Sequence, residues 1–208
     1  MTEQDTEVGQ ARVPNRWGEG QRLRQEILDA AQRLLEATGH PDEISLRAIA
    51  REVGVTASAV YKHFEDKADL LWTLLDTAYA GLADRLLAAH RDALPLGAWA
   101  GVRAAVDVYC RLADEQPRRY DLMFRIAPTL PPRRDPLEVP SKQVLDAWRD
   151  VIIPQFPDDP EAAGRTAKLL WTGLHGQIEL WRNVSADVHD AELSMLRNAL
   201  LTALFGRC

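Results

Sequence analysis

The sequence predicts an all-α protein, and three observations support this fold class. Nearly every segment longer than about ten residues repeats its apolar residues at the spacing of a helix, and no stretch alternates as a half-buried strand does. Proline and glycine separate these segments, as they commonly do between helices. A hydrophobic share of 46% over 208 residues suffices for the cores of one helical domain of ordinary size and a smaller module. The helical segments number about nine in all.

Composition excludes several other classes. The chain has no apolar run of about 18 residues and no basic start followed by an apolar segment, so we expect neither a membrane span nor a secretory signal. A cytoplasmic location is therefore predicted. The two cysteines, Cys110 and Cys208, are too few for a disulfide framework or a zinc site, and we expect no metal and no cofactor.

Charge is distributed unevenly along the chain, whose formal net charge is -6. Residues 1–11 carry three acids and no lysine or arginine, and residues 68–208 carry nineteen acids against sixteen bases, so each segment contributes -3. Residues 12–67 carry nine of each and sum to zero. The part of the chain best suited to a polyanionic partner is therefore near the N-terminus.

The first two helices are marked by their ends. A polar tail, residues 1–19, is expected to be disordered. Gly39 can cap the C-terminus of the first helix. Ser45 is a favourable N-cap for a second, shorter helix, and Gly54 ends it. The apolar stripe of the first helix consists of Leu23, Ile27, Ala30, Ala31, Leu34 and Leu35.

Longer helices are predicted for the rest of the chain. Asp66 suits the N-terminal dipole of a fourth helix that runs to about Arg91. Residues 127–140 contain five prolines in fourteen positions and are predicted to be a loop. Further helices are predicted at residues 98–115, 117–125, 141–153, 160–183 and 189–205.

Residues 45–64 have the size and punctuation of a helix-turn-helix, with a glycine turn between two short helices. In that motif the first helix packs on the second, which keeps one face free for the major groove of DNA. Thr56 is the N-cap of the second helix, and its apolar side is formed by Val60, Tyr61 and Phe64. Its outward residues are Thr56, Ala57, Ser58, Ala59, Lys62 and His63. A plain αα-hairpin is the alternative.

Residues 44–75 resemble the N-terminal domain of the TetR family of one-component transcriptional repressors. The matching elements are Ile44 and Ser45, Ile49 and Ala50, Gly54 and Val55, Tyr61 and Phe64, and Lys67 with Leu70 and Leu71. The resemblance extends over about residues 20–75. It implies a DNA-binding domain at residues 20–67 and a helical ligand-binding and dimerisation domain at residues 68–208.

The resemblance also implies two groups of DNA contacts. The residues that match phosphate-binding positions are Ser45, Thr56, Tyr61 and Lys67, and those that match base-facing positions are Ser58, Ala59, Lys62 and His63. Phosphate contacts position a protein, whereas base contacts give it specificity. Many relatives have Gly and Thr where this chain has Ser58 and Ala59, so readout by a Thr hydroxyl is not available at Ala59.

Several roles stay open in this part of the chain. Tyr61 can equally be a core residue, because it shares a side with Val60 and Phe64. Arg22 and Arg24 can contact phosphate or simply be solvated. Arg12 and Arg16 lie in the tail and are candidates for a minor-groove arm.

The C-terminal half contains a second motif, Trp171, His175 and Gly176, which resembles the Trp-His-Gly class of TetR-family C-terminal domains. The resemblance implies a homodimer through the last two helices and an inducer pocket among the others. The candidate ligand residues are Tyr109, Phe124, Trp148, Trp171 and His175. A core role for these aromatic residues and a satisfied core or interface role for His175 are the alternatives. Gly173 and Gly176 either allow close helix contact or make room for a ligand.

A leucine stripe on the last helix fits a partner helix, and it consists of Leu193, Leu196, Leu200, Leu201 and Leu204. We therefore expect a homodimeric repressor that binds a palindromic DNA operator and is released by a small apolar or aromatic inducer. The sequence has no phosphate-binding loop, nucleophile elbow or paired metal-binding histidines, so we do not expect an enzyme. A TetR-like activator, or a small-molecule-binding protein or enzyme with a vestigial helix-turn-helix, is the alternative.

Overall fold

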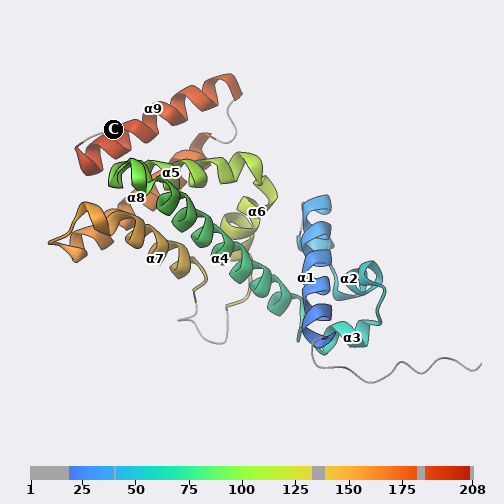
Figure 1. Ribbon diagram of the computed structural model, residues 1–208. Coiled ribbons are helices and arrows are strands. Elements are labelled where there is room, and N and C mark those ends of the chain that lie inside the picture. The colour runs from blue at the N-terminus through green and yellow to red at the C-terminus, as the bar shows by residue number, and fades with distance from the viewer. Residues whose placement is uncertain (1–18, 40, 133–138, 182–185, 207–208) are drawn as a thin grey trace, which may run out of the picture. The chain divides into compact units, whose positions relative to one another are not determined.

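The computed structural model describes residues 19–39, 41–132, 139–181 and 186–206, and every regular element in them is helical (Figure 1). The predicted all-α fold class is confirmed. The chain divides into two compact units, one ending at Lys67 and the other beginning at Ala68. The tail predicted to be disordered, apart from its last residue, lies outside the described residues, as do Arg12, Arg16 and Cys208. No helix within the described residues is both long and apolar enough to cross a membrane.

From residue 19 onward, the described part of the N-terminal unit contains the α-helices α1 Glu19–Thr38, α2 Leu46–Val53 and α3 Ala57–Tyr61. α1 packs on α2, and α2 packs on α3. Gly39 follows α1 with a φ of +72°, as expected of a glycine cap. Small and branched residues fill the core between the helices, chiefly Ile27, Ala30, Ala31, Ile49, Ala50, Val60 and Phe64. Val53 and Val55, next to this core, are half-buried.

The described residues of the C-terminal unit contain the α-helices α4 Lys67–Ala93, α5 Ala98–Glu115, α6 Pro117–Asp121, α7 Ser141–Ile152, α8 Pro160–Trp181 and α9 Ala186–Phe205. α4 begins at the last residue of the N-terminal unit. α8 packs against both α7 and α9. Leu170, Leu174 and Ile178 repeat every fourth residue on α8 and are at most 2% exposed, so one side of this helix belongs to the core.

The segment after α6 departs from a regular helix. We predicted a helix over residues 117–125, but α6 is followed by a π-helical turn, Leu122–Ile126, and by a 3-10 turn, Ala127–Thr129, within the predicted loop. A π turn interrupts the regular ladder of backbone hydrogen bonds. The Tyr79 hydroxyl on α4 donates to the Met123 carbonyl at 2.7 Å, so a buried side chain holds this turn to α4. Residues 133–138 of the predicted loop lie outside the described residues.

Contact between α8 and α9 corrects one expectation for the leucine stripe. A Cβ added to Gly173 would lie 2.8 Å from Leu200 Cδ2, and Leu201 is 2% exposed. Leu201 is therefore buried within its own chain and is not available for a partner helix, whereas Leu200 contacts α8 and remains half-buried. Gly173 allows close helix contact, whereas a Cβ on Gly176 would meet no atom within 4 Å.

Candidate functional site

The turn between α2 and α3 is fixed by its caps. Ser45 Oγ accepts a hydrogen bond from the Ala48 N–H at 3.1 Å and so caps α2. At the other end, Gly54 has a φ of +75°, in the left-handed region that glycine adopts without strain. The Val55 N–H donates to the Ala50 carbonyl at 2.9 Å and closes the end of α2. The segment therefore has the compact helix-turn-helix form that the sequence predicted.

Two hydroxyl groups are held at the exposed start of α3. Thr56 Oγ1 accepts from the Ala59 N–H at 3.3 Å, which caps the helix. The same oxygen lies 3.0 Å from Ser58 Oγ, so the two hydroxyls share a hydrogen bond. Thr56 and Ser58 are exposed, and Ala59 is half-buried. The local bonds restrict how these side chains rotate, although both remain accessible to a partner.

The end of α3 separates core residues from exposed ones. Val60 and Phe64 are 0% and 1% exposed, as predicted, but Tyr61 is 54% exposed. Its interpretation as a core residue beside these two is wrong, because Tyr61 is turned by about 100° from Val60 around the helix. Lys62 and His63 lie in the turn after α3, where the Phe64 N–H donates to the Val60 carbonyl at 3.1 Å. Lys62 is exposed and His63 is half-buried.

Three predicted phosphate-binding residues lie at the starts of helices. Ser45 and Thr56 are the N-caps of α2 and α3, and Lys67 is the first residue of α4. Backbone N–H groups at a helix N-terminus attract anions, and a lysine there adds a full positive charge. Ser45 is exposed and Lys67 is half-buried. Tyr61, the fourth of these residues, is the last residue of α3.

Contacts within the N-terminal unit distinguish Arg24 from Arg22. The guanidinium carbon of Arg24 lies 4.8 Å from the ring centroid of Phe64, a cation–π contact that links α1 to the end of the helix-turn-helix. Arg22 instead forms an exposed ion pair with Glu26 at 2.9 Å. Sequence reasoning left both arginines between phosphate contact and solvation. It missed the role of Arg24 in packing, because no local signal relates it to Phe64.

In the C-terminal unit the five candidate ligand residues come together. Phe124 and His175 have ring centroids 4.5 Å apart, and Tyr109 and Trp148 have centroids 5.9 Å apart. Tyr120, which sequence reasoning did not select, lies 4.7 Å from Phe124 by the same measure. We define the His175 cluster as Tyr109, Tyr120, Phe124, Trp148, Trp171 and His175.

Hydrogen bonds connect the polar groups of the His175 cluster. The Trp171 Nε1–H donates to the Tyr109 hydroxyl oxygen at 3.1 Å. His175 Nδ1 lies 2.8 Å from the Tyr120 hydroxyl and 3.5 Å from that of Tyr109. If Nδ1 accepts from these hydroxyls, the ring proton is on Nε2. Burial lowers the pKa of His175 and so favours the neutral imidazole, while Glu179 has a smaller, opposing effect. One ring nitrogen of His175, Nδ1, therefore has a partner within the candidate ligand cluster, and a ligand-binding or structural role for the residue stays a prediction.

Burial differs across the His175 cluster. Tyr109, Tyr120 and Trp148 are 0% exposed, whereas Phe124, Trp171 and His175 are half-buried. The cluster thus extends from the interior of the unit to its surface. Burial also raises the pKa of Tyr109 well above its usual value, so its hydroxyl keeps its proton near neutral pH.

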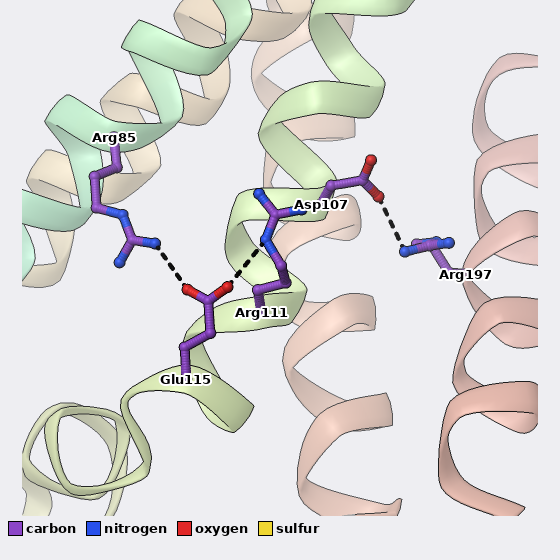
Figure 2. A network of polar contacts seen from close by, with 5 residues as sticks. All are labelled: Arg85, Asp107, Arg111, Glu115 and Arg197. Atoms are coloured by element: carbon purple, nitrogen blue, oxygen red, sulfur yellow. Dashed lines mark hydrogen bonds and ion pairs between the residues drawn. The ribbon is translucent and has the colours of Figure 1, made fainter. Parts of the chain in front are cut away.

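A separate groove of about 260 Å³ lies between α5, α8 and α9, and none of the five candidate ligand residues lines it. Leu174 and Ile178 form its apolar wall. Arg197 on α9 pairs with Asp107 on α5 at 3.0 Å, beside a second ion-pair group in which Glu115 binds both Arg85 and Arg111 (Figure 2). Sequence reasoning missed this groove, because its charged residues come from helices far apart in the chain.

Cys110 also lines this groove. It is a free, half-buried thiol whose pKa is raised to about 11, mainly by burial, so it is protonated near neutral pH. Within the described residues, no three histidine, cysteine, aspartate or glutamate side chains come together to hold a metal ion.

Comparison with known proteins assigns both halves of the chain. The family model for bacterial regulatory proteins of the tetR family matches residues 27–72, and the model for the tetracyclin repressor-like C-terminal domain matches residues 102–204. The HTH-type transcriptional regulator AcrR of Shigella flexneri is 45% identical over 62 residues, which is 28% of each chain. The match thus spans about a quarter of this curated relative.

Solved structures extend the similarity to nearly the whole fold. A protein of unknown function from Rhodococcus sp. RHA1 has a TM-score of 0.69 at 25% identity, covering 88% of this chain and 95% of its own. A TetR-family transcriptional regulator from Streptomyces coelicolor has a TM-score of 0.61 at 20% identity, covering 88% and 97%. The fold and these similarities place the chain in a class of all-helical proteins that carry an N-terminal helix-turn-helix. The chain belongs to the TetR family of bacterial regulatory proteins.

Proposed function

We propose that the protein is a homodimeric repressor in the cytoplasm, which binds a palindromic DNA operator and is released by a small aromatic or apolar ligand. Residues 20–67 form the DNA-binding domain, and residues 68–208 form the ligand-binding and dimerisation domain. The proposal assigns no catalytic step to the chain. Turnover of a substrate by the purified protein would therefore contradict it.

The observation that carries this proposal is the capped helix pair α2 and α3. In the segment 56–64, Val60 and Phe64 are buried and hold α3 to the rest of the unit. Thr56, Ser58 and Lys62 in the same segment are exposed. A helix held in this way can enter the major groove. We assign phosphate contacts to Ser45, Thr56, Tyr61 and Lys67, and base contacts to Ser58, Ala59, Lys62 and His63.

The first test is a gel shift with the DNA upstream of the protein's own gene. We expect a shifted complex on a fragment that contains two half-sites about one helical turn apart. A selection from random DNA provides an independent source of operators. If neither the upstream DNA nor the selected pool yields a specific complex, the protein is not a DNA-binding regulator. A reporter gene under the operator then distinguishes a repressor from an activator.

Substitutions separate the two groups of proposed contacts. Lys67→Ala should weaken binding to every operator and reduce the salt slope of log K by about 0.9 per lost phosphate contact, or about 1.8 per dimer. Lys62→Ala or His63→Ala should alter the preferred bases more than the salt slope. Lys142→Ala is the matched control, since Lys142 is an exposed lysine on α7 paired with Asp146 at 2.7 Å. Equal losses on all operators for Lys67→Ala, Lys62→Ala and His63→Ala would refute this division of roles.

Dimerisation is supported by apolar residues that the single chain leaves exposed. Leu169 and Leu180 on α8 are 57% and 78% exposed, and Met195 on α9 is 57% exposed. A separation of eleven residues places Leu169 and Leu180 on nearly the same side of the helix. We expect light scattering to give twice the mass of one chain. The double substitution Leu169→Lys and Leu180→Lys should give a monomer, whereas Leu96→Lys, at a residue 83% exposed between α4 and α5, should not.

The ligand site that we propose is the half-buried side of the His175 cluster. Aromatic rings with a few polar groups are typical of small-molecule sites. Trp171→Ala should therefore change the response to ligand and leave operator affinity unchanged. If Trp171→Ala loses dimerisation to the same extent as it loses the response to ligand, Trp171 has a structural role instead of a ligand-binding one.

A further inference from the structure

Hydrogen-bond donors outnumber acceptors in the His175 cluster. The Trp171 Nε1–H uses the Tyr109 oxygen as its acceptor at 3.1 Å. The hydroxyls of Tyr109 and Tyr120 both approach one nitrogen, His175 Nδ1, at 3.5 and 2.8 Å. A neutral imidazole has a single acceptor nitrogen. When Nδ1 carries no proton, the main acceptor of the cluster is therefore shared between two donors.

One buried N–H group of the cluster has no acceptor within the described part of the chain, and a second lies on a half-buried ring. Trp148 Nε1 is buried and has no hydrogen-bond partner within the described part of the chain. An indole nitrogen can only donate. His175 Nε2 carries the ring proton when Nδ1 accepts, and because the ring is half-buried this N–H can meet water or a ligand. Buried donors without partners are rare in folded proteins, so the one at Trp148 calls for an explanation.

None of the six members of the His175 cluster is a carboxylate that could pair with a cation. Glu179, four residues after His175 on α8, favours the charged imidazole electrostatically, but it lies outside the cluster and takes part in a further interaction. Moving an ammonium group from water into such surroundings is strongly unfavourable. A cation–π contact with Phe124 offsets only part of this cost.

We propose that the ligand of this site is an aromatic or planar apolar molecule that carries a carbonyl, carboxylate or ether oxygen, and that aromatic amines of the same size are rejected. The oxygen accepts from Trp148 Nε1, His175 Nε2 or both, while the planar body lies against the rings of Phe124 and His175. This inference rests on the proposed function, because it names the class of ligand that the regulator binds.

The test uses three probes with one bicyclic body: 2-naphthoate, 2-acetonaphthone and 2-(aminomethyl)naphthalene. The first two carry oxygen acceptors, one anionic and one neutral, and the third carries an ammonium group at neutral pH. Calorimetric titration of the full chain should give affinities at least about tenfold higher for both acceptor probes than for the amine, the factor that one hydrogen bond contributes.

A conservative variant connects this preference to Trp148. Trp148→Phe keeps a ring in the core and removes only the indole, so affinity for 2-acetonaphthone should fall about tenfold while affinity for the amine changes little. Trp99→Phe is the matched control, since Trp99 contacts Phe205 instead of the cluster. Nuclear magnetic resonance of the wild-type chain avoids the risk of a misfolded variant. Its Trp148 indole N–H signal, assigned from the variant, should move downfield when 2-acetonaphthone binds.

Three results would overturn the proposal: tighter or equal binding of the amine, no binding of either acceptor probe, or binding that leaves the Trp148 indole signal in place. A gel shift with the same preparation separates this failure from that of the proposed function. If the protein binds its operator and yet prefers the amine, the regulator stands and the ligand class is wrong. If it binds an acceptor probe and no DNA, the ligand class stands and the regulator does not.

Discussion

Alanine at Gly54 tests the geometry of the turn that orients α3. Gly54 has φ +75° and ψ +31°, and a Cβ built on it would meet no atom within 4 Å. The substitution therefore adds backbone strain without a steric clash. Strain of this kind costs about 1–2 kcal/mol for an L-residue. Because folded domains are stable by about 5–15 kcal/mol, Gly54→Ala should remain folded and keep most of its operator affinity.

Urea unfolding followed by far-ultraviolet circular dichroism measures this loss. Gly54→Asn is the first control and should lose less, because asparagine adopts left-handed conformations more readily than alanine. Gly164→Ala is the second control, with the same chemical change inside α8 and also no atom within 4 Å of the new Cβ. It should stabilise the chain by about 0.5–1 kcal/mol. The reasoning fails if Gly54→Ala is as stable as the wild type, or if its loss exceeds about 4 kcal/mol, which would indicate a clash.

Three further predictions concern the C-terminal unit. Gly101→Ala would place a Cβ 2.5 Å from His90 Nδ1 and 3.0 Å from the His90 carbonyl oxygen, so thermal unfolding should show a loss of about 1–3 kcal/mol; an unchanged melting temperature would contradict this close contact. Tyr79→Phe leaves the buried Met123 carbonyl without its 2.7 Å hydrogen bond and should cost about 1–3 kcal/mol in urea unfolding; a variant as stable as the wild type would show that this bond does not stabilise the turn. Burial lowers the pKa of His175 from its usual 6.5, so the unfolded chain takes up a proton on this residue at a higher pH than the folded chain does. The neutral His175 therefore contributes its full stabilisation above pH 6.5, and this stabilisation is lost as the pH falls below 6.5. His175→Phe should remove that part of the pH dependence of stability, and an identical pH profile for the variant and the wild type would refute the assignment.

Elements governed by local signals were predicted closely. Ser45, Gly54 and Thr56 mark the ends of α2 and α3 in the sequence and occupy the same capping positions in the structure. Such caps depend on hydrogen bonds within three or four residues, so they need no knowledge of the tertiary fold. The helix predicted over residues 98–115 likewise coincides with α5, since proline and glycine end the preceding helix.

Elements decided by packing were not predicted. α3 has only five residues, too few for periodicity to decide whether Tyr61 joins the buried side. The π turn after α6 has no pattern of its own, because it adds one residue to a turn within an otherwise helical sequence. The stripe containing Leu200 fits any helix partner, and the structure uses Leu200 against α8 of the same chain.

For the His175 cluster, the sequence indicated most of the member residues but not how they are arranged. The sequence selected five aromatic or histidine residues of the His175 cluster, because aromatic residues in this half suggested a pocket. It did not select Tyr120, whose hydroxyl makes the shortest hydrogen bond to His175 in the cluster. These two residues come from different helices, and periodicity reports only which side of a helix is apolar. Which polar groups meet on those sides depends on how α5, α6 and α8 pack.

The two units satisfy their polar groups in different ways, and this determines how substitutions should combine. In the N-terminal unit, Ser45 and Thr56 each cap their own helix, so their effects on stability should add. In the His175 cluster, Tyr109 and Tyr120 share His175 Nδ1, so removing one hydroxyl leaves the other to donate more fully. The pair Tyr109→Phe and Tyr120→Phe should therefore cost more together than the sum of the single losses, because only the double variant leaves that nitrogen without a donor. Additive losses would mean that only one of the two tyrosines donates to His175.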